Sequence, residues 1–261
     1  MATCYRHPSR ETGVSCSSCG RPICPDCMTP TPVGMRCPEC ASQRTQVHTM
    51  ASTRSDPRVT VAIIIVCAVV FLATNGFSGG SGKLWTDLFL DGPGVHDGDW
   101  WRLVTSGFLH AGPIHILFNM YLLWILGNLL EPTLGSRRFA ALYFTALLAG
   151  ACGALVVDSS SPTVGASGAV FGLMGAAAVE LRSRGINPFK TDIGVLIIFN
   201  LILSFAISHI SVGGHVGGLI GGVLVGIAYD VADRRRMPAL AYGACLALSA
   251  IAVIGALQAA A

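Results

Sequence analysis

The sequence predicts an all-α polytopic membrane protein with seven transmembrane helices, preceded by a small zinc-finger domain. Hydrophobic residues make up 52% of the 261 residues and charged residues only 12%, whereas a soluble domain carries roughly 25% charged residues. The cysteines and the apolar runs are also separated, because seven of the ten cysteines lie before residue 41 and the long apolar runs lie after residue 58. These observations exclude an ordinary soluble globular protein.

The charge pattern argues against nucleic-acid binding, and the sequence divides into four segments. The formal net charge is only +3, and the basic residues form short scattered clusters instead of a stripe. We expect a cytoplasmic zinc-binding domain at 1–42, a linker at 43–58, a six-helix core at 59–231, and a seventh transmembrane helix with the C-terminus at 232–261.

The first part, which we call the head (residues 1–42), is predicted to bind two structural Zn²⁺ ions. Two ligands separated by two residues form half of a tetrahedral site, so four such half-sites complete two ions. A disulfide framework is the alternative, but seven cysteines leave one thiol unpaired, and the head is predicted to face a reducing cytosol. So short a segment buries little apolar core, and the metal would supply most of the folding free energy. The predicted ligands are Cys4, His7, Cys16, Cys19, Cys24, Cys27, Cys37 and Cys40.

The spacing of these ligands resembles that of the B-box and related cross-braced zinc fingers. The resemblance implies that the first half-site pairs with the third and the second with the fourth. An unknown cytoplasmic partner of the head is compatible with this organisation.

Seven apolar stretches are predicted to cross the membrane, since about 20 apolar residues span its hydrocarbon core. The first begins too far from Met1 to be a cleavable signal peptide. The uncharged stretch 193–229 is too long for one membrane helix, and we expect a turn at 208–214, where glycine lets the backbone reverse. The predicted spans are 59–82, 113–130, 139–157, 163–179, 193–207, 214–229 and 239–256.

The basic residues predict the orientation, because cytoplasmic loops are enriched in Lys and Arg. Basic clusters precede the first span and occupy every second loop after it, at 137–138, 182–190 and 234–236. We therefore expect a multi-pass protein of the plasma membrane with a cytoplasmic N-terminus and an outer C-terminus. Arg greatly outnumbers Lys, which favours a bacterial source.

Polar residues inside membrane spans are costly and mark candidate functional sites. Ser167 opens the fourth span and His215 the sixth, and His115 and Asn119 share one face at the start of the second. The second, fourth and sixth spans cross the membrane in the same direction, because successive spans alternate. All four residues therefore lie toward the outer face. Ser167 at a helix N-terminus is suited to an oxyanion, and His215 to the role of general base.

Small residues recur every four positions on the fourth span (Gly168, Gly172) and on the sixth (Gly214, Gly218, Gly222). Such stripes let membrane helices approach closely, which would bring the Ser167 hydroxyl to the imidazole. Each feature alone has a commoner structural explanation: packing for the glycines, a backbone hydrogen bond for the serine, and a structural or proton-relay role for the histidine. Their coincidence at one depth favours catalysis.

These motifs resemble those of the rhomboid family of intramembrane serine proteases over roughly 99–229. Gly165-Ala166-Ser167-Gly168 is similar to the family's nucleophile motif, and His215 with its following glycines to its catalytic base. His115-Ile116-Leu117-Phe118-Asn119 resembles the motif of its second helix. Trp101-Arg102, Glu131 and Gly135-Ser136-Arg137 match further positions.

The resemblance implies a Ser167/His215 dyad without an acid, and an oxyanion hole formed by His115, Asn119 and the Ser167 amide. The substrates would be transmembrane proteins in the lipid bilayer, and catalysis would need no cofactor. Phe171 stands where family members often carry Tyr, and an aromatic face is sufficient to pack on the imidazole. Without a third acid, packing has to orient that imidazole.

Three alternatives remain open at this stage. The first is an inactive rhomboid-like protein that binds membrane helices, although such relatives typically lack the serine or the histidine. The second is a small transporter, for which paired inverted halves are expected and no internal repeat is visible. The third places the function in the head and makes the helices an anchor. The residues His110, Asn128, Asn200 and His209 are polar candidates without an assigned role.

Overall fold

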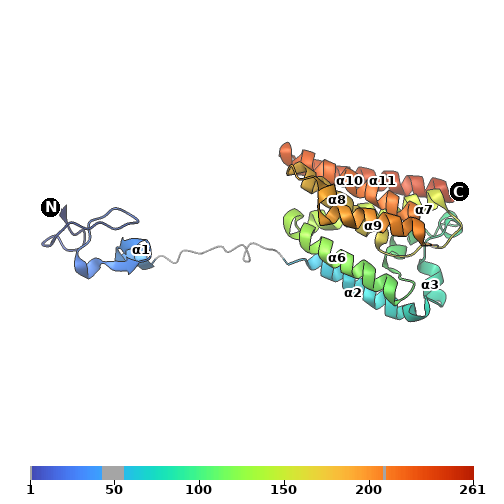
Figure 1. Cartoon of the computed structure of the whole chain (residues 1–261), viewed down its shortest axis with the longest axis horizontal. Helices are drawn as coiled ribbons and strands as arrows, with labels where there is room; N and C mark the ends of the chain where they lie inside the picture. Colours follow the sequence, from blue (N-terminus) through green and yellow to red (C-terminus); the bar gives the residue numbers. More distant parts are fainter. Residues whose placement is uncertain (1, 43–55, 208–209) are drawn as a thin grey trace. The chain divides into compact units, whose positions relative to one another are not determined.

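The computed structural model describes residues 2–42, 56–207 and 210–261. The chain divides into two compact units, Met1–Thr53 and Arg54–Ala261, and each is described by itself (Figure 1). Most of the predicted linker, part of the predicted turn at 208–214, and His209 lie outside the described residues.

The head is built from short elements around its cysteines. Strand β1 (Ala2–Thr3) pairs antiparallel with β2 (Glu11–Thr12), and β3 (Thr29–Thr31) with β4 (Gly34–Arg36). A 3-10 turn, η1 (Pro25–Cys27), and one short helix, α1 (Pro38–Ser42), complete it. Its buried cluster consists of six cysteines and Ile23, a core too small to account for a stable fold by apolar burial alone.

The described residues of the second unit form seven long helices, as predicted, and these run roughly along one direction (Figure 1). The fold class is thus confirmed. Four of them, α6, α7, α10 and α11, are long and apolar enough to cross a membrane; α2 and α9 are shorter apolar helices. The bounds are α2 (Arg58–Ala73), α6 (Pro113–Leu134), α7 (Ser136–Val157), α8 (Ser167–Ser183), α9 (Asp192–Ala206), α10 (Val212–Arg234) and α11 (Pro238–Ala260).

Several predicted boundaries differ from the structure by a few residues, and two of these differences involve glycines. The first helix ends at Ala73 and not near residue 82, because Asn75 and the glycines Gly79, Gly80 and Gly82 all adopt positive φ, which stops the helix. The glycine pair assigned to the turn before α10 lies inside that helix instead. Gly213 belongs to its first turn and packs against α7.

The segment between α2 and α6 folds into short elements held by a buried arginine. These are η2 (Gly76–Ser78), α3 (Lys83–Leu88), α4 (Gly92–His96), α5 (Arg102–Thr105) and η3 (Ser106–Phe108). The Arg102 guanidinium donates to the Asp99 carboxylate at 2.8 Å, to the Thr86 carbonyl at 2.8 Å and to the Phe89 carbonyl at 3.1 Å. An isolated antiparallel β-bridge also joins the backbones of Leu90 and Thr163, just ahead of α8. The segment between α2 and α6 is therefore hydrogen-bonded to the stretch of backbone that leads into Ser167.

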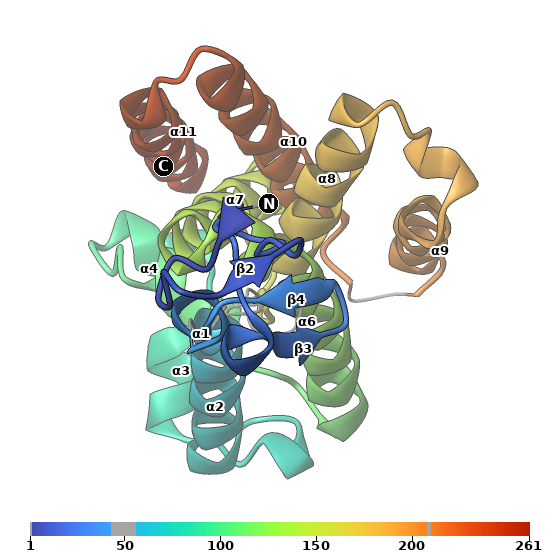
Figure 2. The same cartoon turned by 90° about the vertical axis from the view of Figure 1, so that its left-hand side faces the viewer.

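Helix α10 lies between α8 and α11 and against α7, whereas α9 packs on α8 and α10 at the side of the bundle (Figure 2). The predicted close approach of α8 and α10 is present. A Cβ built on Gly218 would lie 2.0 Å from the Gly168 carbonyl oxygen, and one on Gly222 would lie 1.9 Å from that of Gly172. These two helices run parallel, with their first turns side by side.

A second glycine row on α10 faces α7 and was not predicted. A Cβ on Gly213 would lie 2.2 Å from the Gly153 carbonyl oxygen, and one on Gly217 would lie 2.5 Å from that of Ala149. Helix α10 is therefore held backbone to backbone on two sides, which leaves little freedom in the position of its first turn.

Candidate functional site

Ser167 and His215 meet where the first turns of α8 and α10 lie together. Ser167 is the first residue of α8 and is half-buried; His215 lies in the first turn of α10 and is 8% exposed. The Ser167 Oγ atom lies 2.7 Å from His215 Nε2. This is the distance of a good hydrogen bond, and it joins a hydroxyl to a potential proton acceptor.

The imidazole of His215 stacks on the ring of Phe171, one turn after Ser167. The two ring centroids are 4.3 Å apart and the planes are inclined by 21°. Phe171 is only 2% exposed, so this aromatic neighbour is itself held in the core. Stacking sets the plane of the imidazole but leaves its rotation within that plane free.

A third side chain, Ser204 of α9, contacts the other ring nitrogen of His215. Its Oγ atom lies 2.5 Å from His215 Nδ1 and also donates to the Asn200 carbonyl oxygen at 2.7 Å. The expectation that packing alone orients the imidazole is therefore incomplete. The sequence does not indicate a role for Ser204, because a single serine in an apolar helix ordinarily bonds its own backbone and no motif marks its contact with α10.

His115 and Asn119 lie on the same side of α6, close to Ser167. The Ala111 amide donates to His115 Nδ1 at 3.3 Å, which leaves Nε2 as the protonated nitrogen. A Cβ built on Gly165 would lie 2.7 Å from His115 Nε2 and 3.8 Å from Ser167 Oγ, so both atoms border the same small space. The side-chain amide of Asn119 donates one hydrogen bond to the His115 carbonyl oxygen at 2.9 Å.

These polar groups line one cavity of about 1040 Å³. Helices α6, α8, α9 and α10 all contribute to it. Its polar lining includes His115, Asn119, Ser167, Asn200, Ser204 and His215. A cavity of this size with several polar groups in its wall has room for water molecules that hydrogen-bond to those groups.

The structure also places three of the four polar candidates that had no predicted role. His110 is fully buried edge-on to His115, and its ring nitrogens have no hydrogen-bond partner among the described residues. Asn200 is buried at the cavity and donates to the Leu196 carbonyl. Asn128 donates to the Trp124 carbonyl oxygen within its own helix.

The eight predicted metal ligands form two groups in the head. Cys4, His7, Cys24 and Cys27 make the first group, and Cys16, Cys19, Cys37 and Cys40 the second. Within each group the ligand atoms lie within 4.8 Å of one another. The first half-site thus pairs with the third and the second with the fourth, which is the pairing that the B-box resemblance implies.

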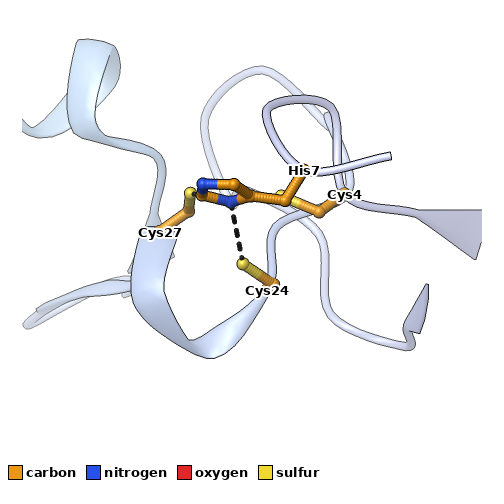
Figure 3. Close-up of side chains that lie close together, drawn as sticks. All are labelled: Cys4, His7, Cys24 and Cys27. Atoms are coloured by element: carbon orange, nitrogen blue, oxygen red, sulfur yellow. Dashed lines mark hydrogen bonds between the residues drawn. The ribbon is translucent and has the colours of Figure 1, made fainter. Parts of the chain in front are cut away.

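The first group faces inward on a common centre (Figure 3). His7 Nδ1 lies 3.3 Å from the Cys24 sulfur and 3.4 Å from the Cys27 sulfur. Ligands in a tetrahedral zinc site, with bonds of about 2.0–2.3 Å, are about 3.5 Å apart. All ten cysteines, which lie within the described residues, are free thiols, so the donor set fits a zinc ion.

Hydrogen bonds make some of these thiols more acidic. Burial raises the pKa of the Cys4 thiol, but backbone hydrogen bonds from Cys24, Arg6 and His7 outweigh it and bring that pKa to about 6. A backbone hydrogen bond from Cys37 lowers the pKa of Cys16, also to about 6. Each group therefore contains a thiol that ionises near neutral pH, and thiolate is the form that binds metal.

The sequence of the second unit is similar to a known protein family and to several known proteins. A family model described as Rhomboid domain matches residues 97–230. Rhomboid protease GluP of Bacillus subtilis is 40% identical over 125 residues, which is 47% of this chain and 24% of that protein. Putative rhomboid protease YdcA of the same organism is 37% identical over 127 residues, 47% of this chain and 64% of that protein.

A plant protein is similar over a shorter stretch. RHOMBOID-like protein 5 of Arabidopsis thaliana is 42% identical over 89 residues, 33% of this chain and 29% of that protein. The aligned part thus spans between about a quarter and two thirds of these relatives. The matched residues 97–230 include Ser167, His215, His115 and Asn119.

Proposed function

The chain belongs to the rhomboid family, and we propose that it is an intramembrane serine endopeptidase that uses a Ser167–His215 dyad. Its substrates are membrane proteins, cleaved in or near a transmembrane helix. One observation carries the proposal, the 2.7 Å separation of Ser167 Oγ and His215 Nε2. That distance suits direct transfer of the hydroxyl proton.

In the first half of the reaction, Ser167 Oγ attacks the carbonyl carbon of the scissile bond and its proton passes to His215 Nε2. The tetrahedral intermediate then collapses, the C–N bond breaks, and His215 returns the proton to the leaving amine. A water molecule hydrolyses the acyl-enzyme in the second half, with His215 again accepting and returning a proton.

The oxyanion of the intermediate is assigned to the space beside Gly165. His115 Nε2 borders that space and carries the proton, because the Ala111 amide occupies Nδ1. The Ser167 amide, at a helix N-terminus, is a second donor. The free amide hydrogen of Asn119 is a third. Preorganised donors of this kind stabilise developing charge more effectively than water does.

The substrate class follows from the position of the site among membrane helices. A peptide bond inside an α-helix is shielded, so the scissile segment has to become extended at Ser167. Small or helix-breaking residues near the cleavage site lower the cost of that unwinding. We expect the substrate helix to enter with its outer end toward the cavity.

The remaining features of the proposal concern the head and the orientation. We propose that each of the two ligand groups holds one structural Zn²⁺ ion. The alternation of basic loops supports a cytoplasmic N-terminus and an active site open to the outer face of a bacterial plasma membrane.

The test combines a serine-directed probe with a cleavage assay on purified protein. A fluorophosphonate should label Ser167, and a single-span test protein should be cut. Ser167→Ala and His215→Ala should abolish both, whereas Ser183→Ala, at the other end of the same helix, should change neither. Cleavage by Ser167→Ala would overturn the dyad. A folded wild-type protein that binds the test helix without cutting it would establish the inactive alternative instead.

A further inference from the structure

The proposed dyad leaves one requirement unexplained, namely which nitrogen of His215 carries the proton. A neutral imidazole has one N–H group, and a general base at Ser167 needs the bare lone pair on Nε2. The partner of the other nitrogen selects the tautomer. Phe171 cannot do this, because its ring stacks on the imidazole and offers no hydrogen-bonding group.

Ser204 provides a polar partner at the required nitrogen. Its hydroxyl has a single proton, which it donates to the Asn200 carbonyl oxygen at 2.7 Å. Toward His215 Nδ1, at 2.5 Å, the Ser204 oxygen can then only accept. Only one direction of donation satisfies all three contacts: Ser204 O–H to Asn200, His215 Nδ1–H to Ser204, and Ser167 O–H to His215 Nε2.

We propose that Ser204 is a positioning residue that holds His215 in the tautomer with a free Nε2. This inference rests on the proposed function and assigns it a third side chain, from a third helix. During acylation His215 becomes an imidazolium with both nitrogens protonated, and Nδ1–H continues to donate to Ser204. Ser204 neither gains nor loses a proton, so the step remains balanced between Ser167 and His215.

Burial makes this contact difficult to replace. Ser204 is 2% exposed and His215 is 8% exposed, so only a small part of either side chain is accessible from the cavity that both border. A buried N–H group without an acceptor is unfavourable, because it has lost its hydrogen bond to water and gained none in return. Without the Ser204 oxygen, the imidazole is free to rotate or to carry its proton on Nε2. An imidazole protonated at Nε2 cannot accept the proton of Ser167.

The anchoring of Ser204 supports the same assignment. It is buried on α9, one turn after Asn200, whose own amide donates to the Leu196 carbonyl. Two successive turns of α9 therefore hold their polar side chains against their own backbone. This arrangement commits the Ser204 proton to Asn200 and leaves the oxygen lone pairs facing α10.

The kinetic test compares Ser204→Ala with Ser204→Thr. Alanine removes the acceptor, and we expect kcat on a single-span test protein to fall about 10- to 100-fold, a substantial part of what a positioned base contributes, with KM nearly unchanged. Threonine retains the hydroxyl and should recover most of the rate. Thr145→Val is the matched control, because Thr145 is a buried hydroxyl that bonds Ser249 away from the cavity; it should keep wild-type kcat.

A spectroscopic test separates positioning from general damage to the fold. Nitrogen-15 spectra of histidine-labelled protein, assigned by comparison with His215→Ala, should show His215 protonated at Nδ1 in the wild type and in Ser204→Thr. In Ser204→Ala this preference should be lost. Ser204→Cys, a close steric match with a weak acceptor, should resemble alanine and provides a second variant if alanine does not fold.

The two proposals fail differently. If the wild type labels and cleaves at Ser167 while Ser204→Ala has the wild-type kcat, the role of Ser204 is overturned and the protease remains. If the wild type neither labels nor cleaves, the proposed function fails, and the nitrogen-15 spectrum still decides the contact. A wild-type His215 protonated at Nε2 overturns the tautomer assignment in either case.

Discussion

Phe171 and His215 lie face to face, with ring centroids 4.3 Å apart, so the candidate base is packed against the helix that carries the candidate nucleophile. A phenol is not needed for this contact, since the stacking uses the ring face. The relationship makes the imidazole part of the hydrophobic core of the bundle as well as part of the cavity.

The first prediction concerns this stack. Phe171→Leu should lower kcat about 10-fold, because an aliphatic side chain fills most of the volume but no longer defines the plane of the imidazole. Phe171→Tyr should keep most of the activity. Rates on a single-span test protein, together with thermal unfolding in detergent, separate the two effects. Equal rates for leucine and phenylalanine would show that the stack does not position His215.

The second prediction concerns the glycine row between α8 and α10. Gly218→Ala places a methyl group 2.0 Å from the Gly168 carbonyl oxygen, and both atoms belong to rigid helices. The helices have to separate, which should cost about 1–3 kcal/mol of stability and lengthen the Ser167–His215 contact. We expect loss of probe labelling at Ser167.

A matched control exists on the seventh helix. A Cβ on Gly243 of α11 meets nothing within 4 Å, so Gly243→Ala should leave labelling and unfolding temperature unchanged. Equal labelling rates in Gly218→Ala and Gly243→Ala would contradict the packing explanation.

The third prediction concerns Glu131, which joins α6 to the start of α2. Its carboxylate accepts from the Val59 and Thr60 amides, both at 2.9 Å, and from the Ser136 hydroxyl at 2.7 Å. Glu131→Gln removes one acceptor oxygen from a fully buried site and should lower the free energy of unfolding by about 1–3 kcal/mol.

Denaturant unfolding of the two proteins in the same detergent measures this change. Glu180→Gln is the control, because Glu180 pairs with Arg184 at the surface of α8. That substitution should shift stability by at most about 0.5 kcal/mol. A Glu131→Gln protein as stable as the control would show that the hydrogen bonds between Glu131 and the first turn of α2 contribute little to the free energy of unfolding.

The fourth prediction concerns metal in the head. Elemental analysis should find two zinc ions per chain, one for each ligand group. Cys16→Ser and Cys24→Ser should each remove one ion, since they belong to different groups, and the double variant should remove both. Cys152→Ser, in the apolar helix α7, should keep both ions. A folded head without metal would refute the zinc sites.

Much of the architecture was predictable because it depends on local properties of the chain. Apolar runs of membrane length indicated the seven helices, and the two-residue spacing of ligands indicated four half-sites. Parity of the spans indicated that Ser167 and His215 begin helices of the same direction. The end of α2 was missed because a glycine-rich apolar run reads as hydrophobic although its backbone adopts positive φ.

Hydropathy and residue spacing are properties of the chain alone, and they were sufficient to predict the class of the protein, the approximate helices and the residue types available for chemistry. The folded structure was needed to show which face of α10 meets α7 and that Ser204 meets His215. Those contacts join residues on different elements, and they depend on how each helix is rotated and seated against its neighbours. Apart from the glycine stripes that predicted the contact of α8 with α10, no local pattern in the chain indicates that rotation.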